Sequence, residues 1–459
     1  MNQTLAHINN VYLIGIGGIG MSGLARYFKR KGCEVAGYDK TPSALTRELE
    51  AEGISVSYSD DVAAILPPFN SESVLEDILI IYTPAIPADS SIVTFFRDAG
   101  YELYKRSAVL GMLSKDMHTI AVAGTHGKTS TSAMIAHILK HSGYDCTAFV
   151  GGIMTNYKSN VLFGRENAMV VEADEFDRSF LTLHPDIAVI TSMDADHLDI
   201  YGDKGTLEES FSLFAGQLHR GGTLIRKAGL PLQHPGLVYA LEEGEGVDAQ
   251  ARRIRVVNGS YVFDYAWDGH LIQDVKMLFS GLHNVENAVA AMTAALRFGI
   301  DPEHVKKAIE AFKGIKRRFE YIIRDLENNL VFIDDYAHHP RELDACIASI
   351  RQLYPGKKLT MVFQPHLFSR TRDFADEFAE SLAKVDELIL LEIYPAREKP
   401  LEGVNSSMLL DKIRLEKKQL SSQEDLFPRI GRKGTEILVT AGAGDIDRLV
   451  APLKEYLLS

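Results

Sequence analysis

The stretch Gly124-Thr125-His126-Gly127-Lys128-Thr129 decides the expected fold. It follows an apolar run, Thr119–Ala123, and precedes a helix-like run, Thr129–His141. A strand, a glycine-containing turn and a helix in this order are typical of a phosphate-binding loop, where Lys128 reaches the outer phosphates and the Thr129 hydroxyl can hold Mg²⁺. The spacing GxxGKT is shorter than the usual GxxxxGK[ST], and a glycine-rich turn that binds nothing has the same letters. The rest of the chain decides between these readings.

Length and composition indicate a soluble protein of several domains. The chain has 459 residues, too many for one ordinary core. A net charge of −13 argues against a nucleic-acid or anionic-membrane binder. The three cysteines, Cys33, Cys146 and Cys346, have no metal spacing and read as reduced thiols. No apolar run approaches ~18 residues, and the N-terminus is polar. We therefore expect a cytoplasmic protein.

Alternating strands and helices predict three α/β domains in series, over residues 1–115, 116–315 and 316–459. The first has expected strands at 11–16, 34–38, 54–58 and 78–81, with helices at 22–31 and 43–52. The second has strands at 169–172 and 187–190 and a helix at 284–298. Runs at 252–257, 261–265 and 272–275 are separated by Asn258-Gly259 and Asp268-Gly269, which predicts added antiparallel hairpins. The third has strands at 330–333, 359–362, 387–391 and 436–439, with helices at 341–354, 372–382 and 445–457.

A second glycine-rich loop lies near the N-terminus. Gly15-Ile16-Gly17-Gly18-Ile19-Gly20 matches GxGxxG between a strand and a helix, and Asp39 follows the second strand, where a ribose-binding carboxylate belongs. The motif predicts a nucleotide diphosphate but does not distinguish NAD, FAD and a nucleotide sugar. A tight turn that only packs a helix on a strand is the alternative.

Two acidic motifs follow strands of the second segment. Glu172-Ala173-Asp174-Glu175-Phe176-Asp177 is placed to supply an oxygen ligand to Mg²⁺. Asp194-Ala195-Asp196-His197-Leu198-Asp199 could add a second metal or phosphate contact. A solvated acidic turn is the alternative for the first motif, and a structural or exposed histidine is the alternative for the second. Further along, Asn284 and Asn287 share one side of a helix start and could reach a purine or phosphate, although helix capping would explain one of them.

The third segment carries basic and imidazole side chains. Arg317-Arg318-Phe319-Glu320 could bring an arginine to a γ-phosphate, or be a solvated connector. Two polar loops follow successive strands, Asp334–Pro340 with sequence DDYAHHP and Phe363–Arg372 with sequence FQPHLFSRTR. Loops at the carboxyl ends of neighbouring strands favour a ligand site, and the arginines suit a carboxylate.

Taken in order, the motifs resemble the Mur ligases of bacterial cell-wall synthesis over essentially the whole chain. The resemblance rests on these motifs together with HNVENA at 283–288, YPAREKPLEGV at 394–404 and AGAGDI at 441–446. It implies a Rossmann-like N-terminal domain for a UDP-sugar, a central P-loop ATPase-type domain with added antiparallel strands, and a Rossmann-like C-terminal domain for ATP and an amino acid. The branch most resembled implies ATP-dependent ligation of L-alanine to UDP-N-acetylmuramate through an acyl phosphate, in peptidoglycan precursor synthesis.

The resemblance also implies roles for individual residues. Catalytic roles fall on Lys128, Glu175, His197, Arg318 and Asp335. The expected ATP contacts are Gly124, Thr125, His126, Gly127, Lys128, Thr129, Ser130, Asn284, Asn287, Arg318 and Asp335. The expected UDP-sugar contacts are Gly15, Gly17, Gly18, Ile19, Gly20, Asp39, Thr83 and His126. His338, His366 and Arg370 are expected to face the amino acid, while Thr129, Glu175 and His197 are expected to hold Mg²⁺.

The sequence departs from the family pattern at a few positions, and it leaves alternative functions open. Residues 208–218 contain no lysine that could be carbamylated as in some relatives, and Ser130 and Leu367 stand where Thr and Arg are frequent. A ligase that attaches a recycled tripeptide to the same nucleotide is the near alternative. An NAD-dependent oxidoreductase would leave Lys128 and Glu175 unexplained, and a nucleotide-binding regulatory protein would show no turnover. The expected partners are small molecules only, with no nucleic acid or membrane, in a monomer or homodimer.

Overall fold

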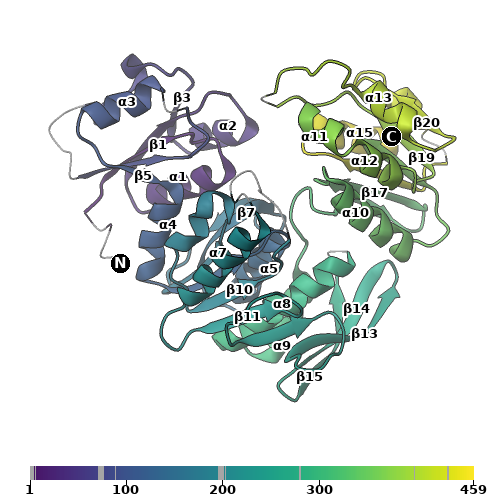
Figure 1. Cartoon of the computed structure of the whole chain (residues 1–459), viewed down its shortest axis with the longest axis horizontal. Helices are drawn as coiled ribbons and strands as arrows, with labels where there is room; N and C mark the ends of the chain where they lie inside the picture. The colour runs from purple at the N-terminus through teal and green to yellow at the C-terminus, as the bar shows by residue number, and fades with distance from the viewer. Residues whose placement is uncertain are drawn as a thin grey trace. The chain divides into compact units, whose positions relative to one another are not determined.

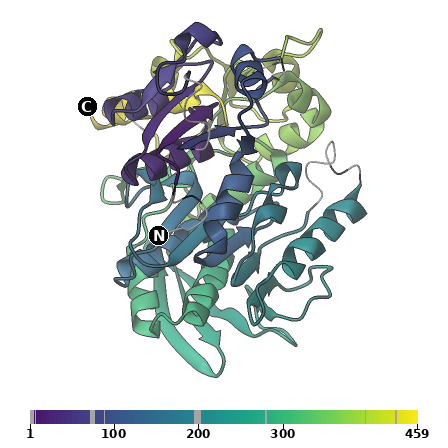
Figure 2. The ribbon, with the colours of Figure 1, turned by 90° about the vertical axis from the view of Figure 1, so that its left-hand side faces the viewer.

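The computed structural model describes residues 5, 7–70, 77–87, 89–194, 201, 203–278, 281–396, 398–431 and 434–459, except for the side chain of Asp177. The chain divides into two compact units. The first comprises residues 1–252, 264–275 and 286–311, and the second comprises residues 253–263, 276–285 and 312–459. The elements of each unit can be followed in Figure 1 and, after a quarter turn, in Figure 2. Among the described residues, no helix has the length and apolar character needed to span a membrane.

The N-terminal sheet is parallel, with strand order β3-β2-β1-β4-β5. Its strands are β1 (Asn10–Ile14), β2 (Glu34–Tyr38), β3 (Ser55–Ser57), β4 (Ile78–Tyr82) and β5 (Leu103–Lys105). Its helices are α1 (Ile19–Arg30), α2 (Ala44–Ala51), α3 (Ser91–Asp98) and α4 (Arg106–Lys115). The strand order reverses at β1, between β2 and β4, and such a switch point places ligands at the carboxyl ends of the strands. The expected Rossmann-like architecture is confirmed.

The ten-stranded central sheet has the order β15-β14-β13-β12-β11-β10-β6-β9-β7-β8. Its parallel middle consists of β6 (His118–Ala123), β9 (Ala168–Glu172), β10 (Ile187–Ile190), β11 (Thr223–Lys227) and β12 (Leu237–Ala240). One edge carries β7 (Thr147–Met154) and antiparallel β8 (Ser159–Leu162). The helices are α5 (Lys128–His141), α7 (Lys204–Gly216), α8 (Leu282–Phe298) and α9 (Pro302–Ala311), with the 3₁₀ helix η3 (Phe176–Thr182).

The predicted hairpins form the other edge of this sheet: β13 (Ala249–Val257), β14 (Ser260–Trp267) and β15 (His270–Met277). Asn258, Gly259, Asp268 and Gly269 all have positive φ, between 49° and 75°. Two-residue turns with positive φ at both positions match the right-handed twist of antiparallel strands. The local turn chemistry therefore fixes this part of the fold.

The third sheet has the order β16-β17-β21-β18-β19-β20. It comprises β16 (Glu320–Asp325), antiparallel to β17 (Leu330–Asp335), and parallel β18 (Leu359–Phe363), β19 (Glu387–Leu390), β20 (Lys418–Leu420) and β21 (Ile437–Ala441). Its helices are α10 (Pro340–Leu353), α11 (Phe368–Asp373), α12 (Ala375–Leu382), α13 (Ser406–Lys412), α14 (Leu426–Arg429) and α15 (Val450–Leu458).

Two helix predictions in this segment are wrong in detail. The helix expected at 372–382 is two helices, α11 and α12, that meet at Phe374, whose φ of −114° departs from helical geometry. The helix expected at 445–457 begins as the 3₁₀ helix η4 (Asp445–Leu449) before α15. Strand β16 was not expected, because the basic stretch before it reads as a connector.

In the first unit, helix α1 of the N-terminal sheet packs against β7 and β8 of the central sheet. Leu24 and Ala25 belong to the same buried cluster as Phe149 and Val161. A Cβ on Gly23 would lie 3.3 Å from the Asn160 amide nitrogen and 3.6 Å from a ring carbon of Phe149, so α1 lies close to both strands. The Asn160 amide also donates to the Ile19 carbonyl at 2.6 Å. These contacts set the distance between the two glycine-rich loops.

Candidate active site

The loop Gly124–Thr129, expected to bind phosphate, joins β6 to α5 and requires both of its glycines. Gly124 has a φ of +136° and Gly127 a φ of +83°. A Cβ on Gly127 would lie 2.5 Å from the Asn287 Oδ1 atom, so Asn287 is packed against the loop. Backbone N–H groups at a helix N-terminus attract anions, and α5 begins directly after Gly127. The loop thus has the backbone geometry that the sequence predicts.

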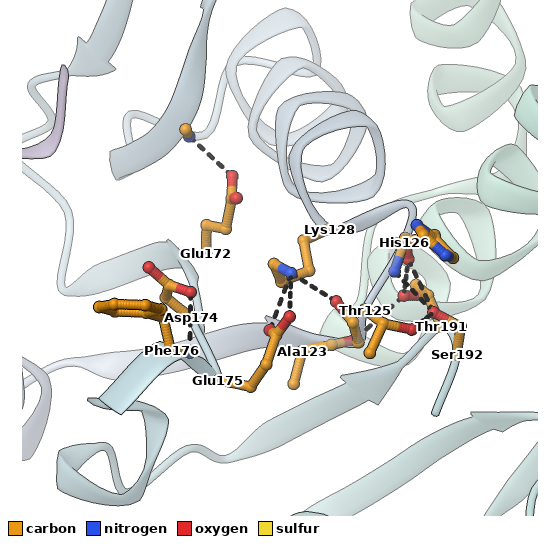
Figure 3. A network of polar contacts seen from close by, with 12 residues as sticks. Ala123, Thr125, His126, Lys128, Glu172, Asp174, Glu175, Phe176, Thr191 and Ser192 are labelled. Carbon is orange, nitrogen blue, oxygen red and sulfur yellow. Dashed lines mark hydrogen bonds and ion pairs between the residues drawn. The ribbon is translucent and has the colours of Figure 1, made fainter. Parts of the chain in front are cut away.

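Two hydroxyls from the end of β10 hold this loop, and the sequence reading missed both. The His126 N–H donates to Ser192 Oγ at 2.7 Å, and the hydroxyls of Thr125 and Ser192 lie 2.9 Å apart. The Thr191 hydroxyl donates to the Ala123 carbonyl at 3.1 Å. Figure 3 shows both side chains beside His126. Their position immediately after β10 could have identified them, because β10 pairs with β6, the strand before the loop.

Lys128 lies against a buried carboxylate, as Figure 3 shows. Its Nζ atom is 2.8 Å from Glu175 Oε1, 2.8 Å from Glu175 Oε2 and 2.6 Å from the Gly124 carbonyl oxygen. Glu175 is 0% exposed, and burial raises the pKa of its carboxyl while the Lys128 charge opposes that rise. The ammonium therefore stabilises a buried carboxylate at the mouth of the loop.

Thr129 contacts Glu172, a carboxylate to which the sequence analysis gave no separate role. Its hydroxyl donates to Glu172 Oε1 at 3.0 Å, and the Gly151 N–H donates to Glu172 Oε2 at 2.7 Å. Thr129, Glu172 and Glu175 supply hard oxygen atoms beside the phosphate-binding loop, which is the donor set that suits Mg²⁺. Among the described residues, no group of three His, Cys, Asp or Glu side chains forms a metal cage. Asp196 and His197 lie outside the described residues.

The first glycine-rich loop is fixed by Asp39. The Gly17 N–H donates to Asp39 Oδ2 at 2.8 Å and the Thr41 N–H donates to Asp39 Oδ1 at 3.1 Å. Thr83 at the end of β4 approaches the same loop, because a Cβ on Gly15 would lie 2.5 Å from its methyl group. A Cβ on Gly18 would meet its nearest neighbour, the Gly15 carbonyl oxygen, at an ordinary 3.5 Å, and Ile19 is exposed. In this structure Asp39 orders the loop itself.

In the second unit, Asp335 organises the connector that carries Arg318. Its carboxylate accepts from the N–H groups of Phe319 at 2.8 Å and Ala337 at 2.7 Å. Burial raises the pKa of Asp335 to about 6. The Arg318 guanidinium lies over the Tyr336 ring, 5.6 Å from its centre. Asp335 and Arg318 are therefore held by one local structure.

The neighbouring pair Arg317 and Asp334 was missed as a pair by the sequence reading. Arg317 Nε lies 3.3 Å from Asp334 Oδ2, and burial raises the pKa of Asp334 to about 7 against the Arg317 charge. Arg317 also lies over Tyr336, 5.1 Å from its centre. Two arginines thus share one aromatic ring, and the buried pair anchors the connector.

In the same unit, Asn284 is buried in the first turn of α8.

The three residues expected to face the amino acid lie in one cluster. The rings of His338 and His366 are 6.1 Å apart, and His366 stacks on Tyr394 at 5.8 Å. Burial, His338 and Arg370 lower the pKa of His366 to about 4. Of the side chains that the structure describes in this cluster, His366 Nδ1 and Arg370 Nη1 are buried without a hydrogen-bond partner. Buried polar atoms without a partner call for a ligand or water.

Family models match three successive parts of the chain. They are described as Mur ligase family, catalytic domain (residues 10–118), Mur ligase middle domain (122–295) and Mur ligase, glutamate ligase domain (317–444). The UDP-N-acetylmuramate–L-alanine ligase of Cytophaga hutchinsonii is 49% identical, over 98% of this chain and 97% of that one. The ligase of the same name from Flavobacterium johnsoniae is also 49% identical, over 99% of both.

Solved structures agree with this fold. The crystal structure of UDP-N-acetylmuramate–alanine ligase from Thermotoga maritima has a TM-score of 0.83 at 25% identity, over 97% of this chain and 98% of that one. A murein peptide ligase from Psychrobacter arcticus has a TM-score of 0.67 at 22% identity over 98% of both chains, a likeness of fold alone. The three family models and the full-length identity lead to one conclusion: the chain belongs to the Mur ligase family.

Proposed function

We propose that this protein is an ATP-dependent ligase that joins L-alanine to the carboxylate of UDP-N-acetylmuramate, in peptidoglycan precursor synthesis. The observation that carries the proposal is the pairing of two nucleotide loops in one unit, with the Lys128–Glu175 pair beside the second. Full-length identity of 49% to relatives with this activity in their name supports the substrate choice.

The reaction has two steps. ATP phosphorylates the sugar-borne carboxylate, forming an acyl phosphate and ADP. The amino group of L-alanine then attacks the acyl carbon, and the tetrahedral intermediate collapses to the amide and phosphate. A carboxylate is a poor electrophile, so phosphorylation supplies the leaving group. Transfer between two anions depends on positioning and charge neutralisation.

In the first step, the backbone of Gly124–Thr129 holds the phosphates and Lys128 moves its charge from Glu175 towards the γ-phosphoryl group. Both oxygens of Glu175 are in contact with Lys128, so the lysine is held at the loop before ATP arrives. We assign Mg²⁺ to Thr129 and Glu175, with His197 for a second ion and Glu172 as an added oxygen donor. When bound, Mg²⁺ neutralises charge on the phosphates.

The other expected site residues are assigned to the three substrates. The Gly15–Gly20 loop, Asp39 and Thr83 serve the UDP-sugar, and Asn284, Asn287, Arg318 and Asp335 serve ATP. We propose His338, His366 and Arg370 for the amino acid, because a buried nitrogen of each of the last two has no hydrogen-bond partner in the described structure. We place the three domains at 1–115, 116–315 and 316–459. A cytoplasmic monomer or homodimer acting on small molecules completes the proposal.

A phosphate-release assay tests this function. UDP-N-acetylmuramate and MgATP are offered with L-alanine, glycine, L-serine or the tripeptide of the recycling ligases. We expect fastest release with L-alanine. Turnover with the tripeptide alone would instead indicate the recycling relative. Binding of ATP and UDP-sugar without release of phosphate would indicate a regulatory protein. In a separate mixture with a nicotinamide cofactor and candidate substrates, a change in nicotinamide absorbance would indicate an oxidoreductase.

A further inference from the structure

Arg106, the first residue of α4, bridges the two nucleotide loops of the first unit. A Cβ on Gly20, the last glycine of the GxGxxG loop, would lie 2.9 Å from Arg106 Nη1 and 3.2 Å from its Cζ atom. The other terminal nitrogen, Nη2, lies 3.6 Å from Asp174 Oδ2. Glycine at position 20 thus allows the guanidinium to lie on the first turn of α1. One side chain contacts both the sugar-nucleotide loop and the residue before Glu175.

Asp174 fixes the backbone on which Glu175 stands. Its Oδ1 atom accepts from the Phe176 N–H at 3.1 Å, as Figure 3 shows, and its carbonyl accepts from the Phe180 N–H at 2.8 Å. Glu175 in turn contacts Lys128. A continuous series of contacts therefore runs from Gly20 through Arg106, Asp174 and Glu175 to the catalytic lysine.

A second contact joins the same two elements. The Thr182 hydroxyl at the end of η3 donates to the carbonyl of Ser107, the residue after Arg106, at 2.8 Å. A Cβ on Gly111 in α4 would lie only 2.5 Å from the Thr182 carbonyl oxygen. Helix α4, which follows the last strand of the N-terminal sheet, is thereby docked on the short helix that follows Glu175.

The Arg106–Asp174 contact has room to tighten. At 3.6 Å it is longer than a charge-assisted hydrogen bond, and the two side chains are 24% and 38% exposed. Arginine has five N–H donors in a planar fork and can hold an anion on one edge and a carboxylate on the other. An anion on the Gly15–Gly20 loop would draw the guanidinium to one defined position and so order Asp174.

We infer that Arg106 is a positioning residue that couples occupancy of the sugar-nucleotide loop to nucleotide binding at the phosphate loop. The inference rests on the proposed function. With a sugar diphosphate bound, Arg106 orders the Asp174–Phe176 turn and thereby Glu175 and Lys128. The coupling is reciprocal, because linkage between two binding sites has the same factor in both directions.

The test measures the dissociation constant of a non-hydrolysable ATP analogue with and without saturating UDP-N-acetylmuramate. For the unmodified protein we expect the sugar nucleotide to tighten analogue binding about 5-fold or more. In Arg106→Ala and in Asp174→Asn, the ratio of the dissociation constants measured without and with the sugar nucleotide should fall to about 1. The dissociation constant of the analogue alone should stay within about 2-fold of its value for the unmodified protein. Arg106→Lys keeps the charge without the fork and should retain only part of the coupling.

Arg165→Ala is the matched control, because Arg165 is 94% exposed and pairs with Asp145 at 3.3 Å on the surface of the same unit. It should leave the ratio unchanged. Retained coupling in Arg106→Ala, with or without weaker sugar binding, overturns the inference. If Arg106→Ala does not fold, Asp174→Asn and Arg106→Lys decide the question. Absence of turnover in the unmodified protein would instead refute the proposed function.

Discussion

The proposed function gives Lys128 two separable roles, one in stability and one in turnover, and replacing it with methionine tests both. Glu175 has no exposed surface, so Lys128→Met leaves a buried carboxylate without its countercharge. Removing one partner of a buried ion pair costs about 3–5 kcal/mol. Charges that stabilise a phosphoryl-transfer transition state contribute about 10³-fold or more to turnover. We therefore expect Lys128→Met to lose both stability and phosphate release.

The double variant Lys128→Met/Glu175→Gln separates the two roles. It removes both charges, so most of the lost free energy of unfolding should return while turnover stays absent. Denaturant unfolding measures the first quantity and phosphate release the second. UDP-N-acetylmuramate affinity, from titration calorimetry without ATP, should stay within about 3-fold, because neither residue belongs to the loop assigned to that ligand. These three measurements together separate the effect of the ion pair on stability from its effect on turnover.

Lys140→Met is the control on the same helix, since Lys140 pairs with Asp145 at a partly exposed position. An exposed pair contributes about 1 kcal/mol or less, and turnover should not change. The reasoning is refuted if Lys128→Met unfolds at the same denaturant concentration as the unmodified protein. It is equally refuted if turnover falls by less than about 10-fold.

Three further outcomes are expected. Thr129→Val removes the hydroxyl that contacts Glu172 and should raise the Mg²⁺ concentration needed for half-maximal turnover, whereas Thr129→Ser should not. Arg370→Ala should raise KM for L-alanine about 10-fold or more and leave KM for ATP unchanged, and equal changes in both would contradict its assignment. His137 is buried beside Tyr157, and burial lowers its pKa from 6.5 to about 4. The unfolded chain therefore takes up a proton between pH 6.5 and 4 that the folded chain does not, so stability falls as pH drops through this window by up to ~3 kcal/mol. His137→Gln should flatten this part of the unfolding profile, and an unchanged slope would show that His137 does not cause it.

Local patterns predicted the architecture well. The strands expected at 34–38 and 187–190 coincide with β2 and β10, and the hairpins follow from Asn258-Gly259 and Asp268-Gly269. Turn residues with positive φ and runs of apolar residues act over a few positions, so sequence reading captures them. Lys128 and Glu175 were both expected near a nucleotide, because both motifs follow strands of the same parallel sheet, but their direct contact was not predicted.

Contacts between distant segments were not predicted. Ser192 holds the loop at His126, 66 residues away, and Thr129 contacts Glu172, to which no separate role was given. Which side chains contact the loop depends on the direction in which each strand end points them. The spacing of the motifs along the sequence does not determine that direction. Arg106 likewise gives no local signal, since its importance comes from its approach to Gly20 and Asp174.

The acyl phosphate is the central claim, and isotope transfer tests it most directly. UDP-N-acetylmuramate labelled with ¹⁸O in its free carboxylate is turned over with MgATP and L-alanine, and the released phosphate is analysed by mass spectrometry. Formation of the acyl phosphate predicts one ¹⁸O atom in each phosphate released. Unlabelled phosphate, formed while the amide accumulates, would show that the carboxylate never received the phosphoryl group and would contradict the account.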